Sequence, residues 1–212
     1  MIGDASEWVV PLFPEEEIPH ILSALLRCLN GFYKLDPLDK ETSLTKRLLK
    51  RLKADQKLRD RPVWPDREAI HDDDVSGNEG RLDLRFMLLD AKQKPPPYFA
   101  IEAKRLHVTF KSGWESLASK YVSHHQGMMC FIDGRYSKGL RFGGMLGYVF
   151  DGDVTKAASL ISNQLLTNRE KLRLKLPHVL EPSRESTPDT VWQTSHQIDG
   201  RTFKLFHILA AV

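Results

Sequence analysis

Two segments, residues 81–89 and 98–106, constrain the fold most strongly, because each alternates between two kinds of side chain. In the first, apolar residues alternate with charged ones, which is the period of a half-buried β-strand. In the second, alternate residues again fall on opposite faces of an extended chain. The prolines of segment 94–97 cannot continue a ladder of hydrogen bonds, so the chain is predicted to turn between the strands.

If the two strands are neighbours, three charged side chains meet on one face of the sheet. These are Asp83 from the first strand and Glu102 and Lys104 from the second. Two carboxylates beside a lysine are the groups that a metal-dependent phosphodiesterase needs. The same residues also fit a plain α/β module in which Asp83 forms an ion pair with Arg81, Arg85 or Lys104 across the strands.

Asp83 followed by Glu102-Ala103-Lys104 resembles the D…ExK signature of the PD-(D/E)XK, or restriction-endonuclease-like, nuclease superfamily. An acid followed by ExK also arises by chance, but here ExK lies inside an apolar strand, after a strand that carries the acid and after a helix. The order of elements resembles the superfamily core over roughly residues 38–150.

The resemblance implies Mg²⁺ or Mn²⁺ as the cofactor, held by Asp83, Glu102 and the backbone carbonyl of Ala103. It further implies that Lys104 orients a water molecule or stabilises developing charge. Many nucleases of the superfamily carry an additional acid on the helix before the sheet, and Glu41 is the candidate for that role as a further metal ligand and catalytic residue. A first-turn glutamate that only complements the helix dipole explains Glu41 equally well.

The expected architecture is a single α/β (α+β) domain over residues 1–212, with a central mixed sheet flanked by helices. Residues 1–35 are predicted to form an arm and a first helix, residues 36–150 the restriction-endonuclease-like core, and residues 151–212 a helix and a C-terminal hairpin. Apolar spacing predicts four helices: one over about 15–33, one that begins at Asp36 or Asp39, one from Ser112 through Val122 with a continuation over 126–132, and one that begins after Asp151 or Asp153. A further strand is predicted over 143–150. Asp199-Gly200 is predicted to form the turn of the C-terminal hairpin.

A basic segment precedes the two strands. From Lys40 to Arg61 there are nine Lys or Arg residues against three acids, a local balance of +6 that exceeds the +3 of the whole chain. Such a patch suits a phosphate backbone, and it equally suits a solvated helix face. The residues expected to bind nucleic acid are Lys46, Arg47, Lys50 and Arg51 in this segment, with Tyr121 and Gln126 from a later helix.

The sequence therefore predicts a metal-dependent endonuclease acting on nucleic acid, with DNA as the expected substrate and a homodimer as one possible assembly. The alternative is a catalytically inactive relative that binds nucleic acid or serves as a scaffold subunit. A role as an effector in bacterial defence against phage follows by analogy only. The chain has no Gly-x-x-x-x-Gly-Lys-Ser/Thr motif, so any energy coupling is expected from a partner such as a sensor or helicase.

The composition, 41% hydrophobic and 28% charged, is that of an ordinary globular protein, and no apolar run reaches the roughly 20 residues of a membrane span. The N-terminus does not read as a secretory signal, which predicts a cytoplasmic protein. Cys28 and Cys130 are expected to be buried thiols. His196 and His207 are expected to approach each other on the hairpin as a hydrogen-bonded structural pair, with a pH-sensitive or substrate contact as the alternative, and His71–Asp74 to form a solvated acidic loop.

Overall fold

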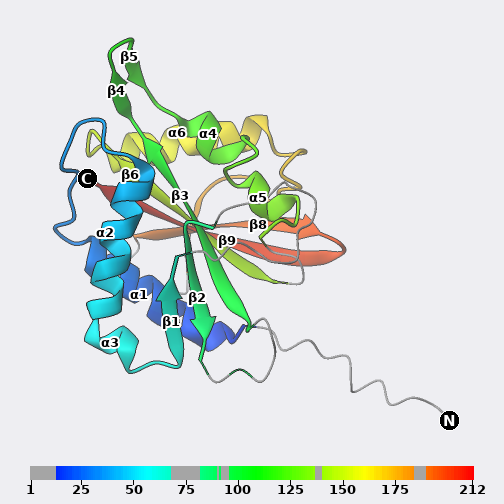
Figure 1. The fold of residues 1–212 in the computed structure, drawn as a ribbon. Coiled ribbons are helices and arrows are strands. Elements are labelled where there is room, and N and C mark those ends of the chain that lie inside the picture. Colours follow the sequence, from blue (N-terminus) through cyan, green and yellow to red (C-terminus); the bar gives the residue numbers. More distant parts are fainter. Residues whose placement is uncertain (1–12, 68–81, 90, 92–95, 137–139, 184–189) are drawn as a thin grey trace, which may run out of the picture.

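The structure, a computed structural model, describes residues 13–67, 82–89, 91, 96–136, 140–183 and 190–212. Within these residues the chain forms a mixed α/β fold with one seven-stranded sheet, a small two-stranded sheet and six α-helices (Figure 1). The strand order of the large sheet is β1-β2-β3-β6-β9-β8-β7. The predicted loop over His71–Asp74 lies outside the described residues.

Two strands come from the segments on which the sequence prediction rests. β3 spans Tyr98–Leu106, as predicted, and β2 spans Leu84–Leu88 and pairs antiparallel with it. A strand that was not predicted, β1 (Val63–Asp66), pairs antiparallel with β2. Asp83 lies just before β2 instead of inside it, because the ladder with β3 begins at Leu84.

The other half of the large sheet is built by parallel pairing and a hairpin. β6 (Phe142–Val149) runs parallel to both β3 and β9 (Arg201–Ala211), and β8 (Val191–Ile198) pairs antiparallel with β9. The predicted hairpin turn is confirmed, since Asp199 and Gly200 both adopt positive φ, as a tight two-residue turn requires. β7 (Glu181–Pro182) adds a short edge to β8.

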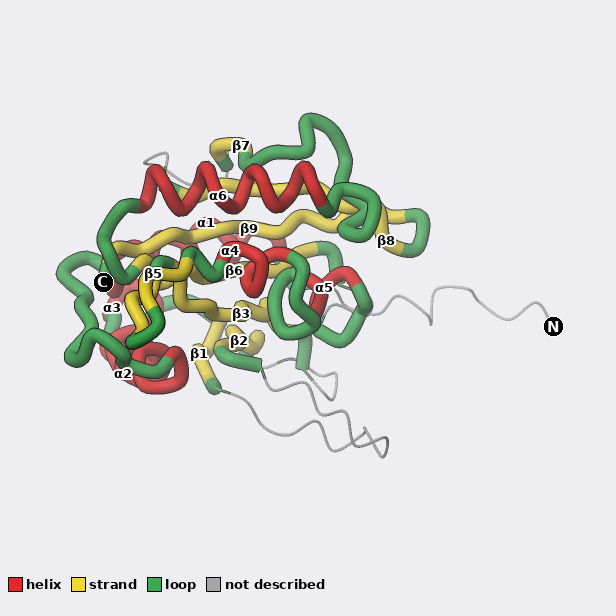
Figure 2. Tube along the Cα trace, turned by 90° about the horizontal axis from the view of Figure 1, so that it is seen from above, coloured by secondary structure: helices red, strands yellow, loops and turns green. Residues whose placement is uncertain are grey.

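Helices cover both faces of the sheet. α1 (Ile18–Leu29), preceded by a 3₁₀ turn (Glu15–Glu17), packs with α2 (Glu41–Ala54) and α3 (Gln56–Arg59) on one side, as Figure 1 shows. α4 (Ala118–Val122), α5 (Met129–Ile132) and α6 (Val154–Thr167) pack on the other, and Figure 2 shows α6 lying along β9. No helix of the described residues is long and apolar enough to cross a membrane.

The apolar stripes explain which helix faces are buried. Leu44, Leu48 and Leu52 of α2 are fully buried, as their spacing predicts. The first helix ends earlier than expected, at Leu29, and Gly31 takes a positive φ in the following turn. α2 begins later than expected: Asp36 and Asp39 accept backbone hydrogen bonds within the preceding connection, and the helix itself starts at Glu41.

The predicted helix from Ser112 is wrong. The chain instead forms a hairpin of β4 (Val108–Phe110) and β5 (Gly113–Glu115), which projects from the body of the molecule (Figure 1). Gly113 has a φ of +125°, which a helix does not allow, and helix α4 begins only at Ala118. The expected continuation over residues 126–132 is reduced to α5 after a turn.

Candidate active site

The candidate site lies where β3 loses its neighbour. Hydrogen-bonded pairing with β2 begins at Leu84, opposite Ile101, so the later backbone groups of β3 have no strand beside them on that edge. Two of these N–H groups are satisfied by carboxylates: Ala103 donates to Asp83 Oδ2 at 2.9 Å, and Arg105 donates to Glu41 Oε2 at 3.1 Å. A buried backbone N–H group without an acceptor costs free energy, so these two hydrogen bonds stabilise Asp83 and Glu41 beside the unpaired edge of β3.

Lys104 lies at the centre of these groups. Its Nζ donates to Glu102 Oε1 at 2.6 Å, to the Ala103 carbonyl at 2.7 Å and to Glu41 Oε1 at 3.0 Å. Its side chain is only 12% exposed, and these three acceptors use all the donors of an ammonium group. One cation is therefore coordinated by three oxygens that come from α2 and β3.

Glu102 is the most deeply buried member of the group. It is 3% exposed, and only one of its carboxylate oxygens is occupied, by Lys104. The other, Oε2, is buried and has no hydrogen-bond partner among the described residues. A buried carboxylate oxygen without a donor or cation is unfavourable, because desolvation is not offset. Among the described residues, this oxygen is the acceptor of the group that could still take a donor or a cation.

The acids affect one another's ionisation. Burial raises the pKa of Asp83 to about 6, even though Lys104 acts in the opposite direction. Burial, and next the charge of Asp83, raise the pKa of Glu102 well above its usual range. Burial lowers the pKa of Lys104, but the carboxylates of Glu102, Glu41 and Asp83 outweigh it and raise the pKa overall. Asp83 and Glu102 therefore hold a proton more readily than exposed carboxyl groups do, whereas Lys104 holds its charge more firmly.

The structure brings together all four side chains that the sequence singled out, Asp83, Glu102, Lys104 and Glu41, with the Ala103 carbonyl among them. In the described part of the chain, however, no three His, Cys, Asp or Glu side chains converge closely enough to hold a metal ion between them. The Lys104 ammonium lies between Glu41 and Glu102 instead. The donor set of hard oxygens, with one buried carboxylate oxygen unsatisfied, fits Mg²⁺ or Mn²⁺.

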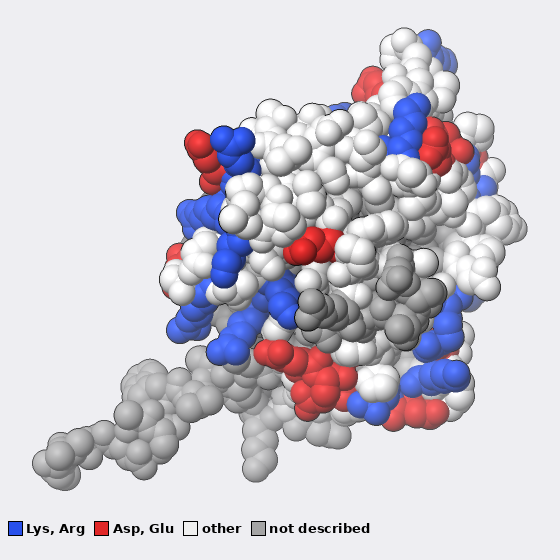
Figure 3. Space-filling view, turned by 180° about the vertical axis from the view of Figure 1, so that it is seen from behind, with Lys and Arg blue, Asp and Glu red and all other residues white. Residues whose placement is uncertain are grey.

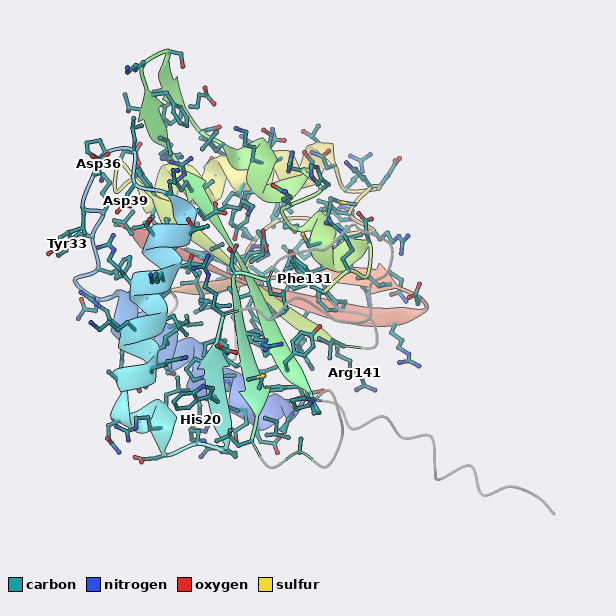
Figure 4. The ribbon with its side chains drawn as sticks, in the orientation of Figure 1. His20, Tyr33, Asp36, Asp39, Phe131 and Arg141 are labelled. Atoms are coloured by element: carbon teal, nitrogen blue, oxygen red, sulfur yellow. The ribbon has the colours of Figure 1, made fainter. Side chains whose placement is uncertain are left out.

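The predicted basic surface of α2 divides into two kinds of residue. Arg47 donates to the Tyr33 carbonyl and pairs with Asp39 at 2.9 Å, and Arg51 donates to three backbone carbonyls between Cys28 and Gly31. Figure 4 shows Tyr33 and Asp39 along the connection between α1 and α2 that these arginines hold. Lys46 and Lys50, in contrast, are exposed. Of the four, only the two lysines retain side chains that are not committed to the fold.

Tyr121 does not serve as a nucleic-acid contact in this fold, so that prediction is wrong. Its side chain is fully buried, and its hydroxyl forms a 3.0 Å hydrogen bond with His207 Nδ1. Gln126 is exposed in the turn between α4 and α5. The helical spacing of Tyr121 identified the helix correctly but not the face that it presents to the core.

His196 and His207 form the expected structural pair, joined through a third residue. Thr194 Oγ1 lies 2.8 Å from His196 Nε2 and 2.9 Å from His207 Nε2, and His196 Nδ1 lies 2.8 Å from the Leu172 carbonyl. Burial lowers the pKa of His196 to about 4 and that of His207 to about 3. Both rings are therefore neutral near pH 7 and belong to the core. Cys28 and Cys130 are buried free thiols, as predicted.

Two features near the site were not singled out by the sequence prediction. Arg105, the residue after Lys104, donates to the carbonyls of Leu38 and Asp39 and so ties β3 to the start of α2. His124 lies beside a group of cations: burial lowers its pKa, and the charges of His125, Lys104, Lys120 and Arg135 lower it further. The position of Arg105 directly after the ExK motif was a signal that could have drawn attention to it. The surroundings of His124 depend on tertiary packing and could not be inferred from the sequence.

Comparisons with protein-family models, with curated proteins and with solved structures found no match for this chain. The geometry of the candidate site and the D…ExK motif are therefore the observations that bear on function.

Proposed function

We propose that the protein is a metal-dependent nuclease of the PD-(D/E)XK type, with a restriction-endonuclease-like core, that hydrolyses phosphodiester bonds of DNA. The observation that carries the proposal is the buried Oε2 of Glu102, which has no hydrogen-bond partner among the described residues. Lys104 donates both to the other oxygen of this carboxyl group and to the Ala103 carbonyl. Asp83, Glu41 and Lys104 surround the same segment of β3. The order of a helix, an acid before one strand and ExK within the next supports the same class.

Asp83, Glu102 and the Ala103 carbonyl would hold Mg²⁺ or Mn²⁺, with Glu41 as a further ligand. A divalent ion supplies two things when bound: it lowers the pKa of a water molecule and neutralises charge on the phosphate. The chain's own residues do the rest. The Ala103 N–H fixes the position of Asp83, the Arg105 N–H fixes that of Glu41, and the Lys104 ammonium donates to the attacking water or to a phosphate oxygen.

The second candidate function is a nuclease-like protein without turnover that binds nucleic acid or acts as a scaffold. The ion pairs of Lys104 with Glu102 and Glu41 favour it, because they neutralise the acids without any metal ion. An effector role in defence against phage, alongside a sensor or helicase subunit, would suit either candidate function and remains a prediction by analogy.

Cleavage of supercoiled plasmid DNA with Mg²⁺ or Mn²⁺ distinguishes the two candidates. We expect the wild type to nick or linearise the plasmid and EDTA to stop the reaction. Glu102→Gln and Lys104→Ala should each reduce the rate at least about a hundredfold, since each removes a group from the reacting centre. Lys57→Ala, an exposed lysine on α3, is the control and should cleave normally. Equal cleavage by all four proteins would contradict the nuclease assignment, and DNA binding without cleavage would support the inactive relative.

A further inference from the structure

An open hollow of about 520 Å³ lies next to the candidate site. Its lining residues come from the β4–β5 hairpin, from the connection before α2 and from α4. Figure 1 shows where these three segments lie in the fold. The side chains that line it are those of Leu38, Phe110, Lys111, Ser112, Glu115 and Lys120. Leu38, which is distant in sequence, and the neighbouring residues 110–120 therefore form one depression on the surface.

Arg105 links this hollow to the candidate site. It follows Lys104 directly on β3, and its guanidinium donates to the Leu38 carbonyl at 3.4 Å and the Asp39 carbonyl at 3.1 Å. The same guanidinium lies 5.9 Å from the centroid of the Phe110 ring. Leu38 and Phe110, two walls of the hollow, are thus held by the residue next to the lysine of the ExK motif. The backbone N–H of Arg105 also donates to Glu41, three residues after Leu38, so the hollow borders the parts of β3 and α2 that carry the candidate site.

The lining combines two chemistries. Lys111 and Lys120 are exposed, and neither forms an ion pair with the described residues, whereas Glu115 is the one acid among the six lining side chains. Phe110 is partly exposed and Leu38 is 43% exposed, so apolar surface lies between the cations. Lysines suit phosphates and an aromatic ring suits the face of a base, which is the combination that binds a single strand. In a duplex the base faces are stacked away from such a surface.

In the view from behind, Lys and Arg side chains gather along the margins, and the upper middle is occupied by uncharged residues (Figure 3). The hollow borders the candidate site through Arg105, and its lining combines two exposed lysines with an aromatic ring. From these observations we infer that the hollow beside the β4–β5 hairpin binds a single-stranded segment of nucleic acid and guides it to the candidate site. This inference rests on the proposed function, because it specifies the form of nucleic acid that enters the site.

The experiment measures binding separately from cleavage. A fluorescein-labelled oligothymidylate and a duplex of the same length are titrated with the full chain in EDTA, and fluorescence anisotropy gives the affinities over a range of salt concentrations. Three double variants carry the same change of charge: Lys111→Ala/Lys120→Ala in the hollow, Lys46→Ala/Lys50→Ala on α2, and Lys57→Ala/Arg59→Ala on α3. Phe110→Leu removes the aromatic ring while keeping an apolar side chain.

We expect the hollow variant to bind the oligothymidylate about tenfold more weakly and to lower the slope of log K against log salt by about 1.4, since each single-strand phosphate contact contributes about 0.7. Phe110→Leu should weaken binding about fivefold or more through lost stacking, with an unchanged melting temperature. The α2 variant should lose less affinity than the hollow variant, and the α3 variant should bind as the wild type does. An equal or larger loss in the α2 variant, no loss in the hollow variant, or a duplex bound as tightly as the single strand would each overturn the inference. Since EDTA removes turnover, these outcomes stand whether or not plasmid cleavage is observed.

Discussion

At the scale of single residues, Lys104 holds a position that a divalent cation would also favour. Its Nζ lies within 2.6–3.0 Å of Glu102 Oε1, the Ala103 carbonyl and Glu41 Oε1. Two cations cannot share these oxygens at such distances, because like charges repel strongly where water is excluded. A metal ion bound to these oxygens would therefore compete with the present ion pairs of Lys104, and we expect the lysine side chain to move away from them in that case.

This competition gives a prediction for Lys104→Met, which keeps the length of the side chain without its charge. We expect the variant to bind Mn²⁺ about tenfold more tightly than the wild type while losing plasmid cleavage, because removal of the ammonium leaves the carboxylates to the metal. Isothermal titration calorimetry measures the affinity, with Lys57→Met as the control for a lost surface charge. A weaker affinity for Mn²⁺ in Lys104→Met would show that the ammonium assists metal binding instead of opposing it.

At the scale of elements, the C-terminal hairpin carries a buried polar network in place of a purely apolar face. Tyr121, His207, Thr194 and His196 are connected in series, and all four are buried. The histidines have lower pKa values in the fold, about 4 and about 3, than the roughly 6.5 of an unfolded chain. Between those values the unfolded state binds more protons, so acidification favours unfolding.

The pH dependence of unfolding tests this account. As pH falls below about 6.5 toward about 4, each histidine should lower the free energy of unfolding by up to about 1.4 kcal/mol per pH unit. His196→Asn keeps an amide that can donate to the Leu172 carbonyl but removes one titrating group, so its curve should be shallower than the wild-type curve by up to that slope. Urea unfolding at a series of pH values provides the comparison, in which contributions from other groups cancel. Parallel curves for the two proteins would contradict the buried-histidine account.

The elements also show how far the sequence could take the prediction. The alternation in Tyr98–Leu106 defined β3 to the residue, and with it the common face of Glu102 and Lys104. The segment that forms β5 was interpreted as the start of a helix, because Trp114, Leu117 and Tyr121 have helical spacing. That spacing is interrupted by positive φ angles at Gly113 and Leu117, which depend on pairing between Val108 and Glu115. The spacing of apolar residues within one segment carries no information about which strand that segment pairs with.

The same limit applies to the candidate site. The motif identified Asp83, Glu102 and Lys104, and the first-turn position of Glu41 was an additional hypothesis. The charge of Arg47 and Arg51 did not show whether they face a ligand or bind the connection between α1 and α2. An arginine has the same charge in either role, and the structure shows the second one. The position of Lys104 between two glutamates, and the unsatisfied oxygen of Glu102, required coordinates.

At the scale of the whole molecule, the site joins parts of the chain that are distant in sequence. Glu41 belongs to a helix on one side of the sheet, and Asp83 precedes β2. Glu102 points to the side covered by α5, where its charge raises the pKa of the buried Cys130 thiol after the larger effect of burial. Occupation of such a site by a ligand links these elements and stabilises the fold, because the unfolded chain has no assembled site.

We therefore expect Mn²⁺ to raise the melting temperature of the wild type. At a concentration about a hundred times the dissociation constant, binding contributes about 2.7 kcal/mol, which corresponds to a shift of about 5–10 °C for a chain of this size. The double variant Asp83→Asn/Glu102→Gln should show almost no shift, while Lys57→Ala should respond as the wild type does. Differential scanning fluorimetry with EDTA-treated protein measures the effect. The same shift in the double variant would place the metal elsewhere on the molecule.

The gap beside β3 has one more consequence, for spectroscopy. The amide protons of Ala103 and Arg105 end on carboxylate oxygens instead of a neighbouring strand. Their resonances and their exchange with solvent thus depend on where Asp83 and Glu41 lie. In a nuclear magnetic resonance titration these two signals serve as built-in reporters, one for each acid, and they distinguish a ligand that draws a carboxylate away from one that leaves it in place.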